Sequence, residues 1–142
     1  MEFTIRAARD TDIAAMHRIR CSVRENRLCS PSRVTGASYR PYIQAGTAWV
    51  AEEGRRILGF AALDLRSSSV WALFVAPGAE GVGIGRALHG HMLARAQDMN
   101  VGQLWLHTSP GTRAERFYAS AGWQNTGLTP DGELRLQMRL HA

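Results

Sequence analysis

Three glycines at alternating positions, Gly81, Gly83 and Gly85, lie between an apolar run and a helical pattern. Residues 81–86 read Gly-Val-Gly-Ile-Gly-Arg. Glycines let backbone N–H groups approach a ligand closely, and the unpaired N–H groups and dipole of a helix N-terminus favour an anion. The loop therefore predicts a bound diphosphate, with a purely structural tight turn as the alternative. Its GxGxG spacing departs from the GxGxxG dinucleotide fingerprint.

The chain has 17 arginines and no lysine, which removes several kinds of chemistry. A P-loop needs a lysine for the nucleotide phosphates, and PLP enzymes, Schiff-base aldolases and biotin or lipoyl carriers need a reactive lysine amine. The net charge of +5 and the pI near 10.2 indicate an anionic partner, either nucleic acid or a phosphate-rich small molecule. Because the arginines are scattered along the chain, charge alone does not choose between them.

Hydrophobic periodicity predicts the elements that position the glycine loop. Strand patterns occupy residues 3–7, 47–52, 57–65, 70–75, 103–107, 123–126 and 133–140. Helical patterns follow an N-cap at Asp10 or Thr11, a start at Ser30-Pro31, and residues 38–44. Two further helices carry the stripe Ile84, Leu88, Met92 and Ala96 and the segment from about 112 to 121. The order is α+β, with one parallel crossover through the glycine loop.

The length of 142 residues predicts a single domain over 1–142. Apolar runs such as 70–75 fall far short of the ~20 residues that a membrane-spanning helix requires. Met1-Glu2-Phe3 opens no signal-like stretch. We therefore expect a cytoplasmic protein with no membrane partner.

Two segments resemble motifs of a known family. Phe74-Val75-Ala76-Pro77, followed by Glu80 and residues 81–88, is similar to motif A of the GNAT N-acetyltransferases, (Q/R)xxGx(G/A). Residues 114–123, Ala-Glu-Arg-Phe-Tyr-Ala-Ser-Ala-Gly-Trp, resemble that family's motif B, Axx(F/L)YxxxGF, at the expected distance downstream. The resemblance extends over nearly the whole chain. Two linked motifs are a much stronger signal than the loop alone.

The resemblance implies a mixed α/β fold. Its central, mostly antiparallel sheet has six to seven strands with a splayed parallel pair, flanked by about four helices. It also implies acetyl transfer from acetyl-CoA to a primary amine of a small molecule or peptide, with no metal, in a family that is often dimeric. Pantetheine would lie like an added strand between strands 70–75 and 103–107. The residues implied in cofactor binding are Leu73, Phe74, Val75, Gly81, Val82, Gly83, Ile84, Gly85, Arg86 and Arg113. For Arg113, a solvated helix face is the alternative.

Tyr118 matches the family's general acid, which protonates the departing CoA thiolate. A phenol of pKa ~10 that hydrogen-bonds to a thiol of pKa ~8.5 assists its departure. A core tyrosine in an amphipathic helix is the structural alternative. The general base is open: Asp64, His107 and Glu25 are candidates, and each of them also fits an ordinary surface or half-buried polar position.

Two positions depart from the family pattern. Glu80 replaces the usual Gln or Arg, and we expect its charge to turn away from the loop or to pair with an arginine such as Arg86. Gly111 stands where many members have asparagine. Neither change affects the backbone N–H groups expected to bind the anion.

Two other classes of function stay open. One is a basic nucleic-acid-binding module that uses some of the four tryptophans, and the other is an acyl-CoA sensor without turnover. Nucleic acid is otherwise expected only as a carrier of the acceptor amine. The acceptor is expected to contact the segment 25–46 and the loop before the last strand, with Tyr39, Tyr42 and Asn26 as candidates. His17, His89, His91 and His141 are expected at the surface, with no metal pair among them.

Overall fold

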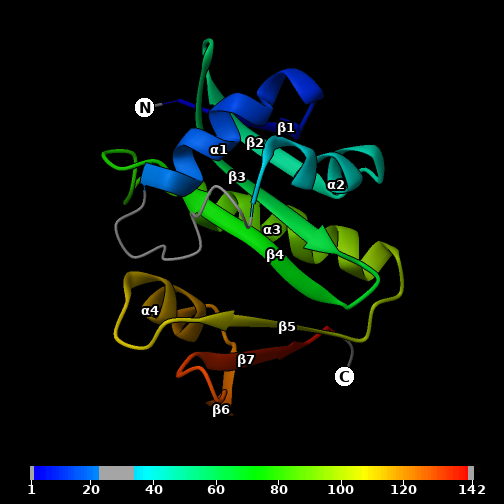
Figure 1. Cartoon of the computed structure of the whole chain (residues 1–142), viewed down its shortest axis with the longest axis vertical. Helices are drawn as coiled ribbons and strands as arrows, with labels where there is room; N and C mark the ends of the chain where they lie inside the picture. Colours follow the sequence, from blue (N-terminus) through cyan, green and yellow to red (C-terminus); the bar gives the residue numbers. More distant parts are fainter. Residues whose placement is uncertain (1, 23–33, 141–142) are drawn as a thin grey trace.

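A computed structural model describes residues 2–22 and 34–140 of the chain (Figure 1). Within these ranges, seven strands form one sheet in the order β1-β2-β3-β4-β5-β7-β6. The strands are β1 (Thr4–Ala7), β2 (Ala48–Glu53), β3 (Arg56–Asp64), β4 (Ser69–Val75), β5 (Gln103–Thr108), β6 (Gln124–Leu128) and β7 (Leu134–Arg139). All neighbours pair antiparallel except β4 and β5, which are parallel. Glu25, Asn26 and the predicted helix start at Ser30-Pro31 lie outside the described residues.

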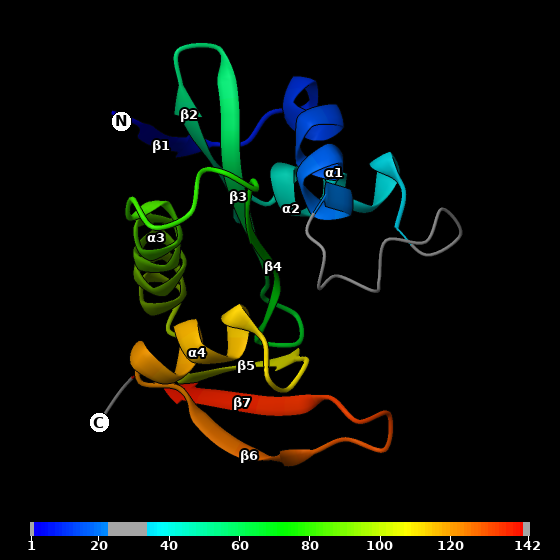
Figure 2. The ribbon, with the colours of Figure 1, turned by 90° about the vertical axis from the view of Figure 1, so that its left-hand side faces the viewer.

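Helices cover both faces of the sheet. The helical elements are η1 (Asp10–Asp12), α1 (Ile13–Ser22), η2 (Gly36–Ser38), α2 (Arg40–Gln44), α3 (Ile84–Asp98) and α4 (Arg113–Ser120). Figure 2 shows α3 and α1 on opposite sides of β3 and β4. Two apolar cores result: the larger joins α3 and α4 to the sheet, and the smaller joins α1 and the α2 region to the other face.

The predicted stripe of α3 is the reason this helix packs where it does. Ile84, Leu88, Met92 and Ala96 are all buried in the larger core. The helix approaches the sheet closely at Gly59 of β3, where an added Cβ would lie 2.9 Å from the Phe74 carbonyl oxygen and 3.1 Å from Ile84 Cγ2. A glycine at this position therefore sets the distance between α3 and the sheet.

The parallel pair β4 and β5 separates along its length. Only Ser69 and Trp105 are register partners, and the Trp105 N–H donates to the Ser68 carbonyl at 3.1 Å, near the start of β4. Beyond this point the strands diverge toward their carboxyl ends (Figure 1). β4 also carries a bulge: Ala62 pairs with Ala72 and Leu63 with Val70, which leaves Trp71 as an extra residue. Bulges increase the local twist of a strand, which favours this divergence.

The predicted fold class is confirmed, including the seven strands, the four α-helices and the splayed parallel pair. The largest difference in strand bounds is at β6, which runs from Gln124 to Leu128 instead of over 123–126. Trp123 instead precedes the strand and is buried in the larger core. Among the described residues, no helix has both the length and the apolar content needed to cross a bilayer.

Candidate active site

The glycine loop presents a row of unpaired backbone donors at the start of α3. Gly81 and Gly83 have φ of +80° and +95°, and Gly83 caps the helix without a side-chain hydrogen bond. In the part of the chain that the structure describes, no acceptor takes a hydrogen bond from the N–H groups of residues 81–86. A Cβ added at Gly81 or Gly83 would meet nothing within 4 Å, so the space beside both is open. The arrangement has the donor pattern of an anion site.

Main-chain groups of the two diverging strands face one another. The Ala76 N–H donates to Leu58 of β3, and strand alternation then turns the N–H and C=O of Leu73 and Val75 toward β5. The same alternation turns the main chain of Phe74 toward β3, where Phe74 pairs with Phe60. On β5, the Leu140 N–H donates to Gly102, which leaves the main chain of His107 directed at β4. We call Leu73, Val75 and His107 the splayed edges.

Three elements meet where the glycine loop joins the splayed edges. A Cβ built at Gly85 would lie 3.5 Å from Phe117 Cε1 of α4 and 3.7 Å from Val75 Cγ2 of β4. α4 is fixed at its N-terminus because Thr112 Oγ1 accepts from the Glu115 N–H at 3.2 Å and Glu115 accepts from the Gly111 N–H at 2.7 Å. Gly111 therefore belongs to the cap of the helix that carries Tyr118.

Tyr118 is the buried aromatic residue of α4 and is 6% exposed. Its ring packs edge-on against Phe117 and Trp123, with centroids 5.3 Å away in each case. Burial raises the pKa of its hydroxyl far above the ordinary value, so the group stays protonated at neutral pH. The hydroxyl has no hydrogen-bond partner within the described residues and is not among the side-chain atoms sealed off from solvent. Tyr118 can therefore donate a hydrogen bond to a ligand, while its raised pKa makes complete transfer of the proton less favourable.

His89 is buried behind Tyr118, which corrects the expectation that it lies at the surface. The side chain is 7% exposed, and its Nε2 accepts a hydrogen bond from Trp123 Nε1 at 2.9 Å. Indole nitrogen can only donate, so this contact requires the neutral imidazole with the proton on Nδ1. Burial also lowers the pKa of His89. The position of His89 directly after Leu88 of the buried stripe is a weak sequence signal for burial, and nothing in the sequence identifies Trp123 as its partner.

Glu80 does pair with an arginine, but with Arg113 of α4 instead of Arg86. Its carboxylate lies 3.5 Å from Arg113 Nη1 and also accepts from the Gly78 N–H at 3.1 Å. The Arg113 side chain is 67% exposed, so the pair contributes little to stability. The acid is thereby tied to α4 and to its own turn beside the glycine loop. Arg86 is exposed in the first turn of α3.

The two described base candidates differ in their surroundings. Asp64 closes the β3–β4 turn: its Oδ1 accepts from the Arg66 N–H at 3.0 Å and pairs with Arg66 Nε at 3.9 Å. This turn lies at the end of β4 opposite the glycine loop. His107 is exposed on β5, with its ring 4.9 Å from that of Trp105. Because its backbone forms one of the splayed edges, His107 lies nearer the anion site than Asp64.

The opposite face of the sheet carries an aromatic cluster under α1 and α2. Tyr42 stacks against Trp71 with centroids 4.6 Å apart, and the Arg20 guanidinium lies 4.8 Å above the Trp71 ring. Tyr39, a candidate pocket residue, is instead fully buried and hydrogen-bonds to His17 at 2.8 Å. Of the aromatic residues predicted to contact an acceptor, Tyr42 keeps a partly exposed surface.

The family model of the acetyltransferase (GNAT) domain matches residues 8–135 of the chain. This range includes the glycine loop, the splayed edges and Tyr118. The chain belongs to the GNAT acetyltransferase family. Among solved structures, this GNAT chain is similar to a putative acetyltransferase of Salmonella typhimurium solved with its cofactor acetyl-CoA. The two structures superpose with a TM-score of 0.82 at 22% sequence identity, and the alignment covers 100% of this chain and 96% of the other.

Two further solved acetyltransferase structures are similar to this chain over nearly its whole length. The PaiA N-acetyltransferase of Thermoplasma acidophilum, in complex with coenzyme A, has a TM-score of 0.83 at 14% identity, with 98% and 99% of the two chains covered. The ribosomal-protein-S18-alanine N-acetyltransferase of Escherichia coli has a TM-score of 0.77 at 18% identity, with 99% and 96% covered. At these identities the likeness shows a shared fold.

Proposed function

We propose that this GNAT protein transfers the acetyl group of acetyl-CoA to a primary amine. The observation that carries the proposal is two groups of main-chain donors without a partner among the described residues, one at residues 81–86 and one along the splayed edges. An acyl-CoA has the matching sequence of groups, with a diphosphate, then pantetheine amides, then a thioester. The solved relatives with acetyl-CoA and coenzyme A support the choice of this ligand.

The N–H groups of residues 81–86 would hold the diphosphate, and the main chains of Leu73 and Val75 would bind the pantetheine. The Leu73 side chain lines the larger core together with α3 and α4. An N–H at the splayed edges would also stabilise negative charge as it develops on the thioester oxygen. Since the Phe74 main chain is already paired with β3, its part is confined to packing under the α1 and α2 face. When bound, acetyl-CoA supplies the activated acyl group.

Tyr118 would act as the general acid by donating a hydrogen bond to the sulfur of the leaving CoA thiolate, which lowers the cost of its negative charge while the C–S bond breaks. Its hydroxyl stays protonated at neutral pH and lies on the α3 and α4 side of the sheet. The thiol, with a pKa of ~8.5, is a moderate leaving group that benefits from a donated hydrogen bond. The acceptor amine would then approach from the opposite face, so that nucleophile and leaving group stay on different sides of the sheet.

His107 is the better of the two described candidates for removing the ammonium proton. Its imidazole is exposed on the α1 and α2 face, next to the splayed edges, and can act through a water molecule. Asp64 is engaged by the main chain of its own turn and by Arg66. We assign Asp64 to the turn and not to the reaction.

Calorimetric titration with acetyl-CoA, followed by thiol release across amines, polyamines and short peptides, tests the proposal. We expect binding of acetyl-CoA and turnover with at least one amine. Binding without turnover on any amine would favour an acyl-CoA sensor. Affinity for nucleic acid with none for acetyl-CoA would favour a basic binding module and overturn the proposal.

A further inference from the structure

The sheet face opposite α3 and α4 is only partly covered. α1 and α2 pack on β2, β3 and β4, whereas the strands beyond β4 extend past them (Figure 2). Along β7, Leu134 and Leu136 point into the larger core, so the alternating residues Arg135 and Arg139 lie on the partly covered face. In the pairing of β5 with β7, Arg135 lies opposite His107 and Arg139 lies opposite Gln103.

Arg135 is held on an aromatic platform. Its guanidinium carbon lies 4.3 Å above the ring of Trp105, and Trp105 Nε1 donates to the Ser67 carbonyl at 2.8 Å. The His107 ring lies beside the same indole, with centroids 4.9 Å apart. Stacking on an anchored indole limits the motion of the guanidinium without using its N–H donors.

The charge of Arg135 is not neutralised by the described part of the chain. The ion pairs found there join Arg6, Arg66 and Arg113 to acids, and the Arg135 guanidinium makes no hydrogen bond to any described residue. Its neighbours Trp105 and His107 supply no carboxylate. An ordered guanidinium with free donors is suited to bind a carboxylate or a phosphate in a bidentate manner.

We propose that Arg135 binds an anionic group carried by the acceptor amine, so that the preferred acceptors bear a carboxylate or a phosphate. This inference rests on the proposed acetyl transfer. Arg135 is opposite His107, whose main chain forms one of the splayed edges, so an acceptor anchored there lies at the same end of the sheet as the expected thioester. The platform thus selects acceptors by charge and orients their amine.

Matched pairs of amines test the inference. The anionic members are ω-amino carboxylates and ω-aminoalkyl phosphonates of several chain lengths, and each is paired with the neutral alkylamine of the same length. Their kcat/KM values come from thiol release at saturating acetyl-CoA. We expect the wild-type protein to favour an anionic member, and Arg135→Gln to reduce that preference about tenfold while leaving the neutral amine unchanged.

Arg139→Gln is the matched control, since it removes the same charge from the same strand at the other end of β5. It should leave the preference unchanged, whereas Arg135→Lys should keep part of it because the charge stays and the planar fork is lost. Circular dichroism and melting temperature establish that each variant is folded. If Arg135→Gln does not fold, Arg135→Lys and Trp105→Phe carry the test.

Three results would overturn the inference: a wild-type protein that acetylates neutral and anionic amines equally, equal losses in Arg135→Gln and Arg139→Gln, and competitive inhibition by a DNA oligonucleotide that both variants relieve equally. The last two would indicate that polyanions bind non-specifically over a broad basic surface. A protein that binds acetyl-CoA and acetylates neutral amines without any charge preference leaves the proposed function intact. One that binds no acetyl-CoA rejects both proposals.

Discussion

The hydroxyl of Tyr118 combines burial of its ring with the absence of any hydrogen-bond partner among the described residues. Replacement by phenylalanine removes only this oxygen and keeps the ring contacts with Phe117 and Trp123. We expect Tyr118→Phe to lower kcat about 100-fold, as is typical when a general acid is removed. The Kd for acetyl-CoA measured by calorimetry should change little.

Thr126→Val serves as a control for Tyr118→Phe, because it removes a hydroxyl on the exposed strand β6 whose partner among the described residues is the Arg135 carbonyl oxygen. Its kcat should match that of the wild-type protein. Equal losses of acetyl-CoA affinity and turnover in Tyr118→Phe would show that the residue has a packing role and not a chemical one.

The buried contact between His89 and Trp123 makes stability depend on pH. Burial lowers the pKa of His89 in the folded state, so the unfolded chain binds more protons as the solution becomes acidic. The stability that depends on neutral His89 is fully present above the ordinary histidine pKa of ~6.5. It is lost as pH falls toward the lower pKa of the folded state. Urea unfolding should show this loss in the wild-type protein, and His89→Leu should flatten it.

At neutral pH, His89→Leu leaves the buried Trp123 N–H without an acceptor, which costs roughly 1–3 kcal/mol. The double variant His89→Leu/Trp123→Phe removes both partners and should recover part of that loss. If the stability losses of His89→Leu and Trp123→Phe simply added in the double variant, and His89→Leu kept the acid dependence, the hydrogen bond would not be the cause of that dependence.

Among the elements, the packing of helix α3 on the sheet depends on Gly59 of strand β3. A methyl group at Gly59 would meet the Phe74 carbonyl oxygen and two side chains of α3 at 2.9–3.3 Å. Overpacking of this kind costs about 1–3 kcal/mol, so Gly59→Ala should lower the melting temperature. Gly90→Ala is the control on α3 itself, where a Cβ meets nothing within 4 Å. It should stabilise the protein by roughly 0.5–1 kcal/mol through helix propensity.

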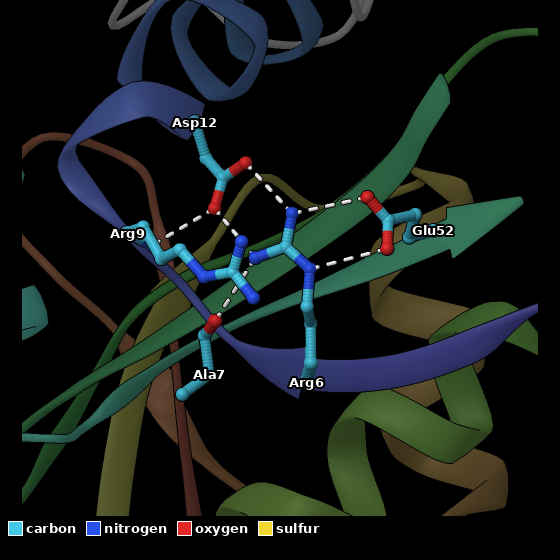
Figure 3. Close-up of polar contacts among 5 residues, drawn as sticks. All are labelled: Arg6, Ala7, Arg9, Asp12 and Glu52. Atoms are coloured by element: carbon cyan, nitrogen blue, oxygen red, sulfur yellow. Dashed lines mark hydrogen bonds and ion pairs between the residues drawn. The ribbon is translucent and has the colours of Figure 1, made fainter. Parts of the chain in front are cut away.

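A network of charges fixes β1, η1 and β2 relative to one another (Figure 3). The Arg6 guanidinium donates to both Asp12 oxygens at 2.8 and 2.9 Å and to Glu52 at 3.1 and 3.2 Å. Burial of Asp12 opposes its ionisation, but hydrogen bonds from Arg6 and from the Arg9 N–H outweigh this and keep its pKa below the usual value. Hydrogen bonds from Arg6 also lower the pKa of Glu52.

Since both carboxylates have lowered pKa values, their stabilisation is complete above the ordinary pKa near 4 and is lost as pH falls below it. Asp12→Asn should therefore reduce the loss of stability on going from pH 5 to pH 3, as measured by urea unfolding. Asp131→Asn, on an exposed turn, should leave that slope unchanged. A slope unaffected by Asp12→Asn would show that other groups control acid unfolding.

Periodicity in the sequence was sufficient to predict α3, because Ile84, Leu88, Met92 and Ala96 repeat at helical spacing on one buried face. The loop before α3 was also predictable, because three alternating glycines separate the apolar strand pattern from the helical stripe. The buried position of His89 and the stacking of Arg135 on Trp105 were not, because each needs a partner that is distant in sequence. The pairing of Glu80 with Arg113 depends in the same way on how α4 packs beside the loop.

For the molecule as a whole, the two parts of the sheet are joined at one register pair, Ser69 with Trp105. A ligand that binds both splayed edges would connect them. We expect saturating acetyl-CoA to raise the melting temperature and to slow amide hydrogen exchange at Leu73, Val75 and His107, by about 100-fold at 100 times the Kd. The Phe74 amide is the internal control, because it is already paired with β3 in the free protein. Protection of Phe74 alone would contradict the proposed binding mode.

The extra residue at Trp71 has a consequence for how this architecture tolerates change. Without it, β4 would match β3 residue for residue at this point and lose the added twist that favours its divergence from β5. We therefore expect deletion of Trp71 to narrow the gap between β4 and β5 and to weaken the binding of acetyl-CoA, even where it improves the pairing of β4 with β3.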